Sequence, residues 1–596
     1  VIWLLRRLRV ADTVTTAATI FVLVLYLLLA DDRPPIERAV WMVSLYLLAR
    51  LLFRRVALAN TTALAALALL LGRPQWLFDT GFQLSFSAVF LVALLAVPWL
   101  ERSSLPYRQA LAGLDDPARD DTFAPQQAQF RLDLRDLALH LGPARRLLVP
   151  TVRGALNVWD ILVISFAVNL GFVLLMALYF NRITWTGLLA NTVVVPLTGL
   201  LVPLGFLALL TGSLWLSLGK LTAWAVAALS NFLLWVVHTL AQFEGLTWRI
   251  PAPPPIIVVF YVTALAGLAF AVGRSRRVQL LAWAPVLVLL VVISTYPFPP
   301  RLEKNQLEVT VLDVGQGEAI FIALPHGETW LVDGGAGPAL LQEGYQVGYD
   351  MGENIVSPYL WSRGIRRLDR VILTHAHHDH MTGLHAVLDN FRVRHFGVGN
   401  NPQILAYRSL LEHVQRRGIP IENHGRGEKL AVSPVELAVL WPRLDTPPGA
   451  EPSNNDSLVL RFGYGERKIL LPADIESAVE QELILAGMPV AADVLKVAHN
   501  GSRTSTTAEF LSAVAPSVAI ISVATRNPFG HPHPEVLARL RAQQAEVLRT
   551  DRAGAITVRT DSRDLGVESF VAQQRRQPYA NLWQRLTACG HALAHL

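Results

Sequence analysis

The stretch Val371-Ile-Leu-Thr-His-Ala-His-His-Asp-His-Met-Thr-Gly383 places His375, His377, Asp379 and His380 directly after an apolar, β-branched segment. Side chains at i and i+2 of an extended segment project to the same side, so His375 and His377 are expected to point together. Asp379 and His380 follow as the chain turns toward a helix. Imidazole nitrogens and carboxylate oxygens are ligands that divalent metals accept, and the stretch therefore predicts a metal site.

Two more apolar segments end in a potential ligand, namely Ile469-Leu-Leu-Pro-Ala-Asp474 and Val494-Leu-Lys-Val-Ala-His499. The combined set has enough ligands for two metal ions with open positions, and Asp474 is suited to bridge them. Paired ions activate a shared water and clamp a phosphoryl or acyl oxygen during in-line attack. The predicted ligands are His375, His377, Asp379, His380, Asp474 and His499, of which Asp379, Asp474 and His499 are also the predicted catalytic residues.

The composition, 52% hydrophobic and 16% charged, is too apolar for an ordinary soluble protein. The apolar residues are concentrated before residue 300, so we predict a membrane domain over 1–300, a soluble domain over 301–575 and a tail over 576–596. The single cysteine, Cys589, excludes a disulfide framework and a cysteine-rich zinc site. The net charge of +6 comes mostly from arginine. In a membrane protein, arginine usually marks cytoplasmic loops, so the charge is only weak evidence for nucleic-acid binding.

A helix needs about 20 mostly apolar residues to cross a bilayer. About nine segments approach that length, with a large polar loop over 101–154 between the fourth and the fifth. They are 11–30, 39–53, 56–72, 82–100, 155–180, 185–211, 214–240, 256–272 and 278–296.

Arginines in the connecting loops predict the orientation of the membrane domain. If nine helices alternate, one side carries seventeen of these arginines and the other carries five. Because basic loops stay in the cytoplasm, we expect the soluble domain on the extracytoplasmic side.

Polar and helix-breaking residues inside the predicted spans have two readings. They either line a pathway through the bundle or serve interhelical hydrogen bonds and ordinary kinks. Pro196 and Pro203 belong to this group. The candidate channel-lining residues are Asn60, Gln83, Ser85 and Asn191.

After residue 306 the pattern changes to short apolar strands separated by turns, with helical stretches between several of them. This interleaving predicts an α/β domain. The predicted strands are Leu307–Leu312, Ala319–Leu324, Thr329–Val332, Val371–Thr374, Val435–Leu440, Ser457–Phe462, Lys468–Leu471, Val494–Val497, Val518–Ser522 and Ile556–Arg559. The predicted helices include Met381–Phe391, Ile404–Arg416, Ala478–Ala486 and Pro534–Ala545.

The stretch 371–383 resembles the His-x-His-x-Asp-His signature of the metallo-β-lactamase fold, a four-layer αββα sandwich whose members are mostly hydrolases. Further sequence motifs resemble those of the soluble domain of the ComEC-type DNA uptake proteins of natural competence. These motifs are Leu312-Asp-Val-Gly-Gln-Gly-Glu-Ala319, Leu331-Val-Asp-Gly-Gly335, the segment 356–365, Asn454-Asn-Asp-Ser-Leu-Val-Leu460, Ala492-Asp-Val-Leu-Lys-Val-Ala-His-Asn-Gly-Ser502 and Gly530-His-Pro-His-Pro534.

The membrane half resembles the same family independently. Its motifs are Asn60-Thr-Thr-Ala-Leu64, Leu77-Phe-Asp-Thr-Gly-Phe-Gln-Leu-Ser-Phe86 and Leu189-Ala-Asn-Thr-Val-Val-Val-Pro-Leu197. The resemblance implies a multi-pass protein of the bacterial inner membrane that takes up single-stranded DNA, with two Zn²⁺ or Mn²⁺ ions and a nuclease that degrades the other strand. It also implies double-stranded DNA delivered by other uptake proteins and a cytoplasmic DNA-translocating ATPase as partners.

Three motifs of the chain differ from the family's usual sequence. Pro472-Ala-Asp474 stands for Thr-Gly-Asp, Glu318 for Asp, and Asn500 for the second histidine of His-His-Gly-Ser. The turn Asn454-Asn455 occupies the region between His380 and Asp474 where a further ligand histidine is missing. The predicted substrate-binding residues are Asn500, Ser502, His531 and His533. The chain begins without Met, and we expect that its natural N-terminus and an OB-like domain precede residue 1.

Two alternatives to a DNA channel with a nuclease remain open. The chain is either a membrane-tethered metallohydrolase of envelope phosphodiesters, or a DNA channel whose metal domain only binds or gates DNA, an alternative that Asn500 allows. Asp313 and Asp333 follow strands beside glycines, where turn stabilisation is the simpler role, although Asp333 is also within reach of the metal site.

Overall fold

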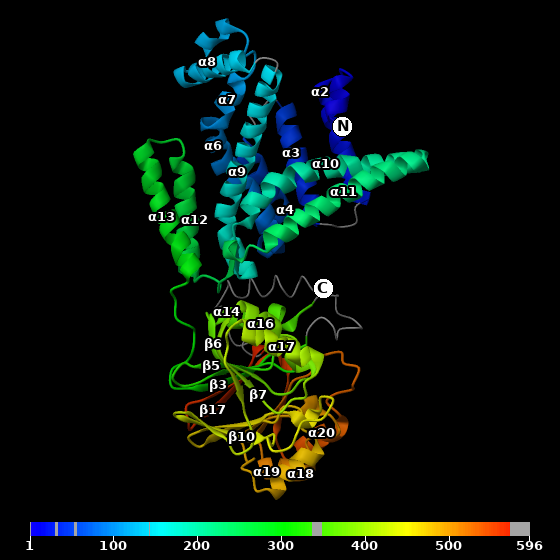
Figure 1. Ribbon diagram of the computed structural model, residues 1–596, viewed down its shortest axis with the longest axis vertical. Helices are drawn as coiled ribbons and strands as arrows, with labels where there is room; N and C mark the ends of the chain where they lie inside the picture. Colours follow the sequence, from blue (N-terminus) through cyan, green and yellow to red (C-terminus); the bar gives the residue numbers. More distant parts are fainter. Residues whose placement is uncertain (1, 30–33, 53–56, 142–143, 337–348, 572–596) are drawn as a thin grey trace. The chain divides into compact units, whose positions relative to one another are not determined.

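The computed structural model describes residues 2–29, 34–52, 57–141, 144–336 and 349–571 (Figure 1). These residues divide into two compact units, with the division between Pro297 and Phe298. The predicted tail 576–596 lies outside the described residues.

The first unit is helical. Six of its described helical segments are long and apolar enough to cross a membrane: Asp12–Leu29 (α2), Thr80–Arg102 (α5, a π-helical turn and α6), Arg145–Phe180 (α9), Thr186–Leu214 (α10), Leu216–Ala241 (α11) and Arg276–Thr295 (α13). Two shorter apolar helices are Leu58–Gly72 (α4) and Pro255–Ala271 (α12). A two-stranded antiparallel sheet joins Arg182–Thr184 (β1) to Thr247–Arg249 (β2).

All nine predicted spans coincide with helices, and three of these helices are shorter or less apolar than the other six. The helices α4 and α12 are short, with 15 and 17 residues. The predicted span 39–53 falls in Pro34–Leu51 (α3), which contains Glu37, Arg38 and Arg50 and is therefore less apolar than the others. Six of the nine are long and apolar enough to cross a membrane among the described residues, and the number of crossings stays a prediction.

The segment 101–154 is a folded helical region. It contains Ser104–Ala110 (α7) and Pro125–His140 (α8) and then enters α9. The Arg131 guanidinium, which is fully buried, donates hydrogen bonds to the carbonyls of Ala110, Gly113 and Asp116. Burying a guanidinium is tolerated when its donors are satisfied, so Arg131 holds this region together.

The second unit contains two mixed sheets. In spatial order, the strands of the eight-stranded sheet are Leu565–Ser569 (β17), Ile556–Thr560 (β16), Leu307–Val311 (β3), Ile320–Ala323 (β4), Thr329–Val332 (β5), Arg367–Leu373 (β6), Arg392–Val398 (β7) and Ile421–Asn423 (β8). Those of the seven-stranded sheet are Glu546–Arg549 (β15), Val518–Ile521 (β14), Val494–Lys496 (β13), Arg467–Leu471 (β12), Val459–Tyr464 (β11), Val435–Trp441 (β10) and Lys429–Val432 (β9).

Helices cover the outer face of each sheet. The helices Ser357–Ser362 (α14), Leu384–Asn390 (α16) and Leu405–Arg416 (α17) pack on the first sheet through a core that includes Leu360, Leu384 and Leu410. On the second sheet lie Ser477–Leu485 (α18), Ala508–Val514 (α19) and Pro534–Ala542 (α20), and Figure 1 shows the two helical groups on opposite sides of the strands.

The core between the two sheets consists of side chains from both, among them Trp330 and Phe462, whose rings meet edge to face with centroids 6.1 Å apart. Because side chains alternate along a strand, each sheet can bury one face against the other sheet and one against helices. The order is therefore helix, sheet, sheet, helix, and the predicted αββα sandwich is confirmed.

Candidate metal centre

Four strand ends converge on one edge of the sandwich. The strands β5 and β6 are parallel neighbours in one sheet, and β12 and β13 are parallel neighbours in the other. Carboxyl ends of parallel strands lie at the same edge of a sheet, which is where α/β folds place their sites. Asp333, His375, Asp474 and His499 each follow one of these strands within one to three residues.

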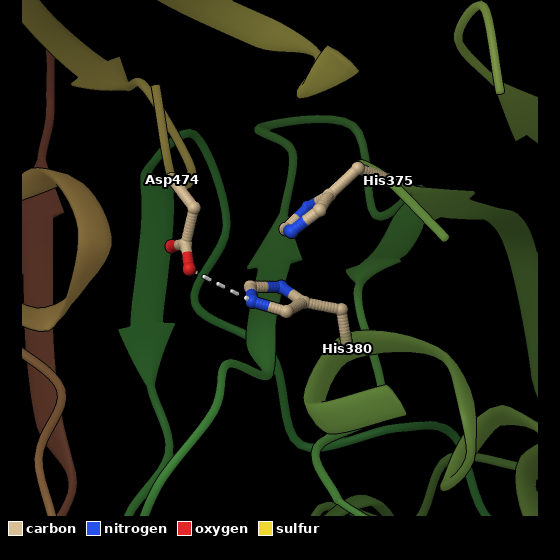
Figure 2. A group of neighbouring side chains, drawn as sticks. All are labelled: His375, His380 and Asp474. Atoms are coloured by element: carbon tan, nitrogen blue, oxygen red, sulfur yellow. Dashed lines mark hydrogen bonds and ion pairs between the residues drawn. The ribbon is translucent and has the colours of Figure 1, made fainter. Parts of the chain in front are cut away.

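Three buried side chains form the centre of this edge. One ligand atom from each of His375, His380 and Asp474 lies within 4.8 Å of the other two. Figure 2 shows both imidazoles and the carboxylate pointing toward one another, with His380 Nε2 3.3 Å from Asp474 Oδ2. His380 belongs to the short helix His378–Met381 (α15), so the strand and the following helix each supply one imidazole.

The ligand chemistry fits a divalent metal. Two imidazoles and one carboxylate form a mixed nitrogen and oxygen set of the kind that Zn²⁺ accepts. No described residue donates a hydrogen bond to Asp474 Oδ1, although the atom is buried. A buried carboxylate oxygen without a hydrogen-bond donor is costly, and positive charge near the carboxylate would reduce that cost.

His377 and Asp379 lie beside this group. His377 Nδ1 is 2.9 Å from His375 Nε2, and His377 Nε2 is 3.2 Å from the carbonyl oxygen of Pro452. Asp379 Oδ2 lies 3.9 Å from His380 Nε2, and its side chain is 29% exposed. The structure thus brings five of the six predicted ligands into one neighbourhood, with Asp379 at its open side.

His499 occupies the rim. Its Nδ1 atom is 3.6 Å from Glu476 Oε1 and 3.4 Å from Asn454 Nδ2, so its described partners are not the other predicted ligands. Asn454 therefore lies next to His499. It belongs to the segment between His380 and Asp474 in which the sequence lacks a further ligand histidine. The backbone of His499 has a φ of 50°, which is unusual for a residue other than glycine and common at functional sites.

Charge is arranged unevenly in the buried group. Burial alone lowers the pKa of His380, but the carboxylates of Asp474 and Asp333 outweigh it and hold that pKa well above its usual value. Burial raises the pKa of Asp474, yet His380 and then Lys496 hold it well below its usual value. Burial and the adjacent His380 lower the pKa of His375 well below its usual value. Without a metal, His380 is therefore the cation and Asp474 the anion of the site.

Residues outside the predicted ligand set orient it. Asp333 Oδ2 accepts from His380 Nδ1 at 2.6 Å and from Thr374 Oγ1 at 2.7 Å. Ser457 Oγ lies 3.3 Å from His375 Nδ1 and accepts from the backbone N–H of Asp474 at 3.2 Å. Such contacts fix the tautomer and direction of metal ligands.

Sequence reasoning missed Ser457 and Thr374 as supports of the site, and it also missed Lys496. Lys496 is buried on β13 and contacts Glu318. The available signal was a lysine in the middle of the apolar segment Val494–Val497, since lysine is almost never fully buried unless it is paired.

The predicted substrate-binding residues lie on two adjoining loops. The N–H of His533 donates to the carbonyl of Gly501 at 2.8 Å, which joins the loop of Asn500 and Ser502 to that of His531 and His533. Asn500 is 1% exposed, and no described residue hydrogen-bonds to its side-chain amide. The His531 ring centroid lies 5.6 Å from that of His499. His533 instead caps α20, accepting from the backbone N–H of Glu535 at 3.4 Å.

The candidate channel-lining residues have different surroundings in the first unit. Gln83 Oε1 accepts from the Tyr179 hydroxyl at 2.7 Å, and Asn191 Nδ2 donates to Ser165 Oγ at 3.1 Å. Ser85 is partly buried, and Asn60 is exposed. Both readings of these polar residues stay open, because interhelical bonds and a pathway each require inward-facing polar groups.

Comparison with known families divides the chain in the same way. The competence protein family model matches residues 1–275, and that of the metallo-β-lactamase superfamily matches residues 312–525. Among solved structures, the metallo-β-lactamase fold protein YhfI from Bacillus subtilis aligns over 42% of this chain and 99% of its own, with 12% identity and a TM-score of 0.26.

Three curated relatives are competence or recombination proteins. ComE operon protein 3 of Bacillus subtilis is 27% identical over 571 residues, covering 94% of this chain and 66% of the relative. Competence protein ComA of Neisseria gonorrhoeae is 29% identical and covers 60% of this chain and 44% of its own length. Recombination protein 2 of Haemophilus influenzae is 29% identical, with 69% of this chain and 50% of the relative covered.

The chain thus spans between about half and two thirds of the length of these relatives. Within that span it carries both matched domains in one order, a competence domain first and a metallo-β-lactamase domain second. This chain therefore carries a competence domain followed by a metallo-β-lactamase domain, and over both domains it is similar to the ComEC-type competence proteins.

Proposed function

We propose that this protein conducts one strand of transforming DNA across the bacterial inner membrane while its metal domain hydrolyses phosphodiester bonds of the other strand. The match of residues 1–275 to the competence family supports the transport role. Six apolar helices of sufficient length among the described residues supply the membrane domain that transport requires.

One observation carries the hydrolytic half of the proposal, the buried group of His375, His380 and Asp474. We assign these three side chains as ligands of a divalent cation. Such a cation, when bound, supplies Lewis acidity toward a phosphoryl oxygen and activates water for attack. Asp379, His377 and His499 surround the group, and we propose that they complete a site for two ions.

Substrate approaches the centre from its exposed side in this proposal. Asp379, whose side chain is 29% exposed, faces that side next to His380. His499 and His531 lie at the rim with their ring centroids 5.6 Å apart. Burial lowers the pKa of His531, so it is neutral at physiological pH, and its one ring N–H is available to donate a hydrogen bond to a phosphodiester oxygen. We assign His531 as a contact for the scissile phosphate and keep His499 as a candidate metal ligand.

If all nine predicted helices cross the membrane in alternation, the arginine distribution of their loops supports an extracytoplasmic metal domain, where incoming double-stranded DNA would meet the nuclease before the membrane. The strand that enters would then be taken over by a cytoplasmic DNA-translocating ATPase. Phosphodiesters of the cell envelope contain the same type of bond as DNA, so they are a chemically similar alternative substrate.

The test uses the full chain purified in detergent, with Mn²⁺ or Zn²⁺ and labelled single- and double-stranded DNA. We expect metal-dependent cleavage that is lost in Asp379→Ala, with unchanged far-ultraviolet circular dichroism. Metal binding without cleavage would instead support the DNA-binding alternative that Asn500 allows. A deletion strain gives the second readout, because normal transformation without the protein contradicts the transport role.

A further inference from the structure

A buried ion pair lies next to the metal centre. Lys496, at the end of β13, contacts Glu318 Oε2 through its Nζ atom, and both side chains are 1% exposed. The same Nζ atom lies 3.9 Å from Asp474 Oδ1. Lys496 is therefore the cation that faces the side of Asp474 opposite to His380, which is 3.3 Å from Oδ2.

Glu318 ties this pair to the loop that carries Asp379. Its backbone N–H donates to the carbonyl of Asp379 at 3.3 Å, and its carbonyl accepts from Gly335 at 2.8 Å. Glu318 precedes β4 in one sheet, whereas Lys496 ends β13 in the other. The ion pair consequently joins the two sheets at the point where each delivers its share of the candidate ligands.

Stability alone is a poor reason for this arrangement. Desolvating two ions costs several kcal/mol each, and an apolar pair of similar volume is often at least as stable. Four carboxylates, those of Glu318, Asp333, Asp379 and Asp474, also gather around His380. A fixed cation among them reduces their mutual repulsion, and Lys496 is placed to do this because its Nζ atom contacts Glu318 and lies 3.9 Å from Asp474 Oδ1.

We propose that Lys496 is a positioning residue for Asp474, with Glu318 as its anchor. Glu318 fixes the ammonium group, and the ammonium group holds Oδ1 of Asp474 on the inner side. Oδ2 is thereby left to face His380 and the cation. This inference rests on the proposed role of the site as a metal centre, and it assigns the Lys496–Glu318 pair to metal affinity in addition to folding.

The test compares Mn²⁺ affinity with stability of the metal-free full chain in detergent, by titration calorimetry and by thermal unfolding in chelator. Lys496→Met leaves Glu318 unpaired, and we expect lower stability together with at least about tenfold weaker Mn²⁺ binding, the effect typical of outer contacts to a metal site. The double variant Glu318→Leu with Lys496→Met removes both charges. We expect it to recover stability while its Mn²⁺ affinity stays about tenfold or more below that of the wild type.

A double variant with wild-type Mn²⁺ affinity would overturn the proposal, because the pair would then serve folding alone. Glu318→Gln and Glu318→Asp provide milder changes if the double variant does not fold. The first keeps size and removes charge, and about tenfold weaker binding is expected. The second keeps charge, and binding within about threefold of the wild type is expected. Equal binding by both variants would contradict the anchoring role.

Glu308→Gln is the matched control. Glu308 is a buried carboxylate of the same domain that pairs with Arg363 and Arg559, away from the candidate ligands. We expect it to lower stability and leave Mn²⁺ affinity unchanged. A wild-type chain that binds no Mn²⁺ or Zn²⁺ would contradict the proposed function itself, whereas wild-type binding that Lys496→Met does not weaken would contradict only the role of Lys496.

Discussion

The Nδ1 atom of His380 lies 2.6 Å from Asp333 Oδ2, and both side chains are completely buried. This contact turns the opposite ring nitrogen of His380 toward Asp474. The carboxylate of Asp333 is itself fixed by the backbone N–H and the hydroxyl of Thr374. A histidine held in this way presents one nitrogen to a metal in a set direction.

Asp333→Asn should therefore weaken Mn²⁺ or Zn²⁺ binding by about 10- to 100-fold, as losses of such contacts typically do. Asparagine tolerates the φ of 59° at this position, so the backbone should keep its path. Titration calorimetry measures the change. Asp369→Asn serves as the control, because Asp369 is a buried carboxylate of β6 that accepts from Thr329 and not from a candidate ligand. Equal weakening by both variants would contradict the orienting role of Asp333.

Metal binding should become tighter as the pH rises from about 6 to 8. Asp474 and Asp333 hold the pKa of His380 well above its ordinary value of 6.5, so a metal must displace a proton from that ring. Calorimetry in buffers of different ionisation enthalpy measures the released proton. The metal-free protein should show the opposite trend, because a raised folded-state pKa gives stability that is complete below the unfolded value of 6.5 and is lost as pH rises through the folded one. Metal affinity that is independent of pH would contradict a protonated His380.

Alanine substitutions at two glycines distinguish the effect of backbone strain from the effect of a steric clash at the candidate metal site. A Cβ atom on Gly317 would lie 2.2 Å from the carbonyl oxygen of Asp379, whereas a Cβ atom on Gly327 would meet nothing within 4 Å. Both have a positive φ, of 109° and 91°, so alanine is strained at either position. Gly327→Ala should cost about 1–2 kcal/mol and leave metal affinity unchanged. Gly317→Ala should cost more and also weaken metal binding, because it displaces the loop of Asp379. Chemical denaturation and calorimetry compare the two.

In the membrane unit, Asp79 has two roles that a conservative change separates. Its Oδ1 accepts from the backbone N–H of Phe82 at the start of α5 and pairs with Arg38 at 2.9 Å, where the arginine side chain is 4% exposed. Asp79→Asn keeps the cap and removes the charge, and it should lower the free energy of unfolding in detergent by about 1–2 kcal/mol, since Asp79 is half exposed. Asp116→Asn changes a cap whose carboxylate pairs with no buried arginine among the described contacts, while its backbone carbonyl still accepts from Arg131, and it should be nearly neutral.

Much of the sandwich could be predicted because its central strands are apolar runs. All ten predicted strands are present, and Thr329–Val332 has the predicted bounds. The strand β7 escaped prediction because Arg392 and Arg394 are exposed on it and hide its apolar pattern. The strands β8 and β15 are short, with three and four residues, and gave too little periodicity to detect.

Ligand types could be read from the sequence more readily than their arrangement. His375, His380 and Asp474 end or follow apolar segments, and the strand order brings them together. Asp333 was predicted mainly to stabilise a turn, yet it contacts His380. The Lys496–Glu318 contact spans 178 residues between two sheets, and no local pattern reports a pairing of that kind.

The measurement that tests the central claim most directly is DNA cleavage by the detergent-purified full chain, with and without Mn²⁺, for the wild type and for Asp379→Ala and Asp474→Asn. Metal-dependent cleavage of a DNA strand by the wild type, abolished in both folded variants, is the predicted result. Cleavage that persists at the wild-type rate in both variants would contradict the assignment of this edge of the sandwich as a metal-dependent nuclease centre.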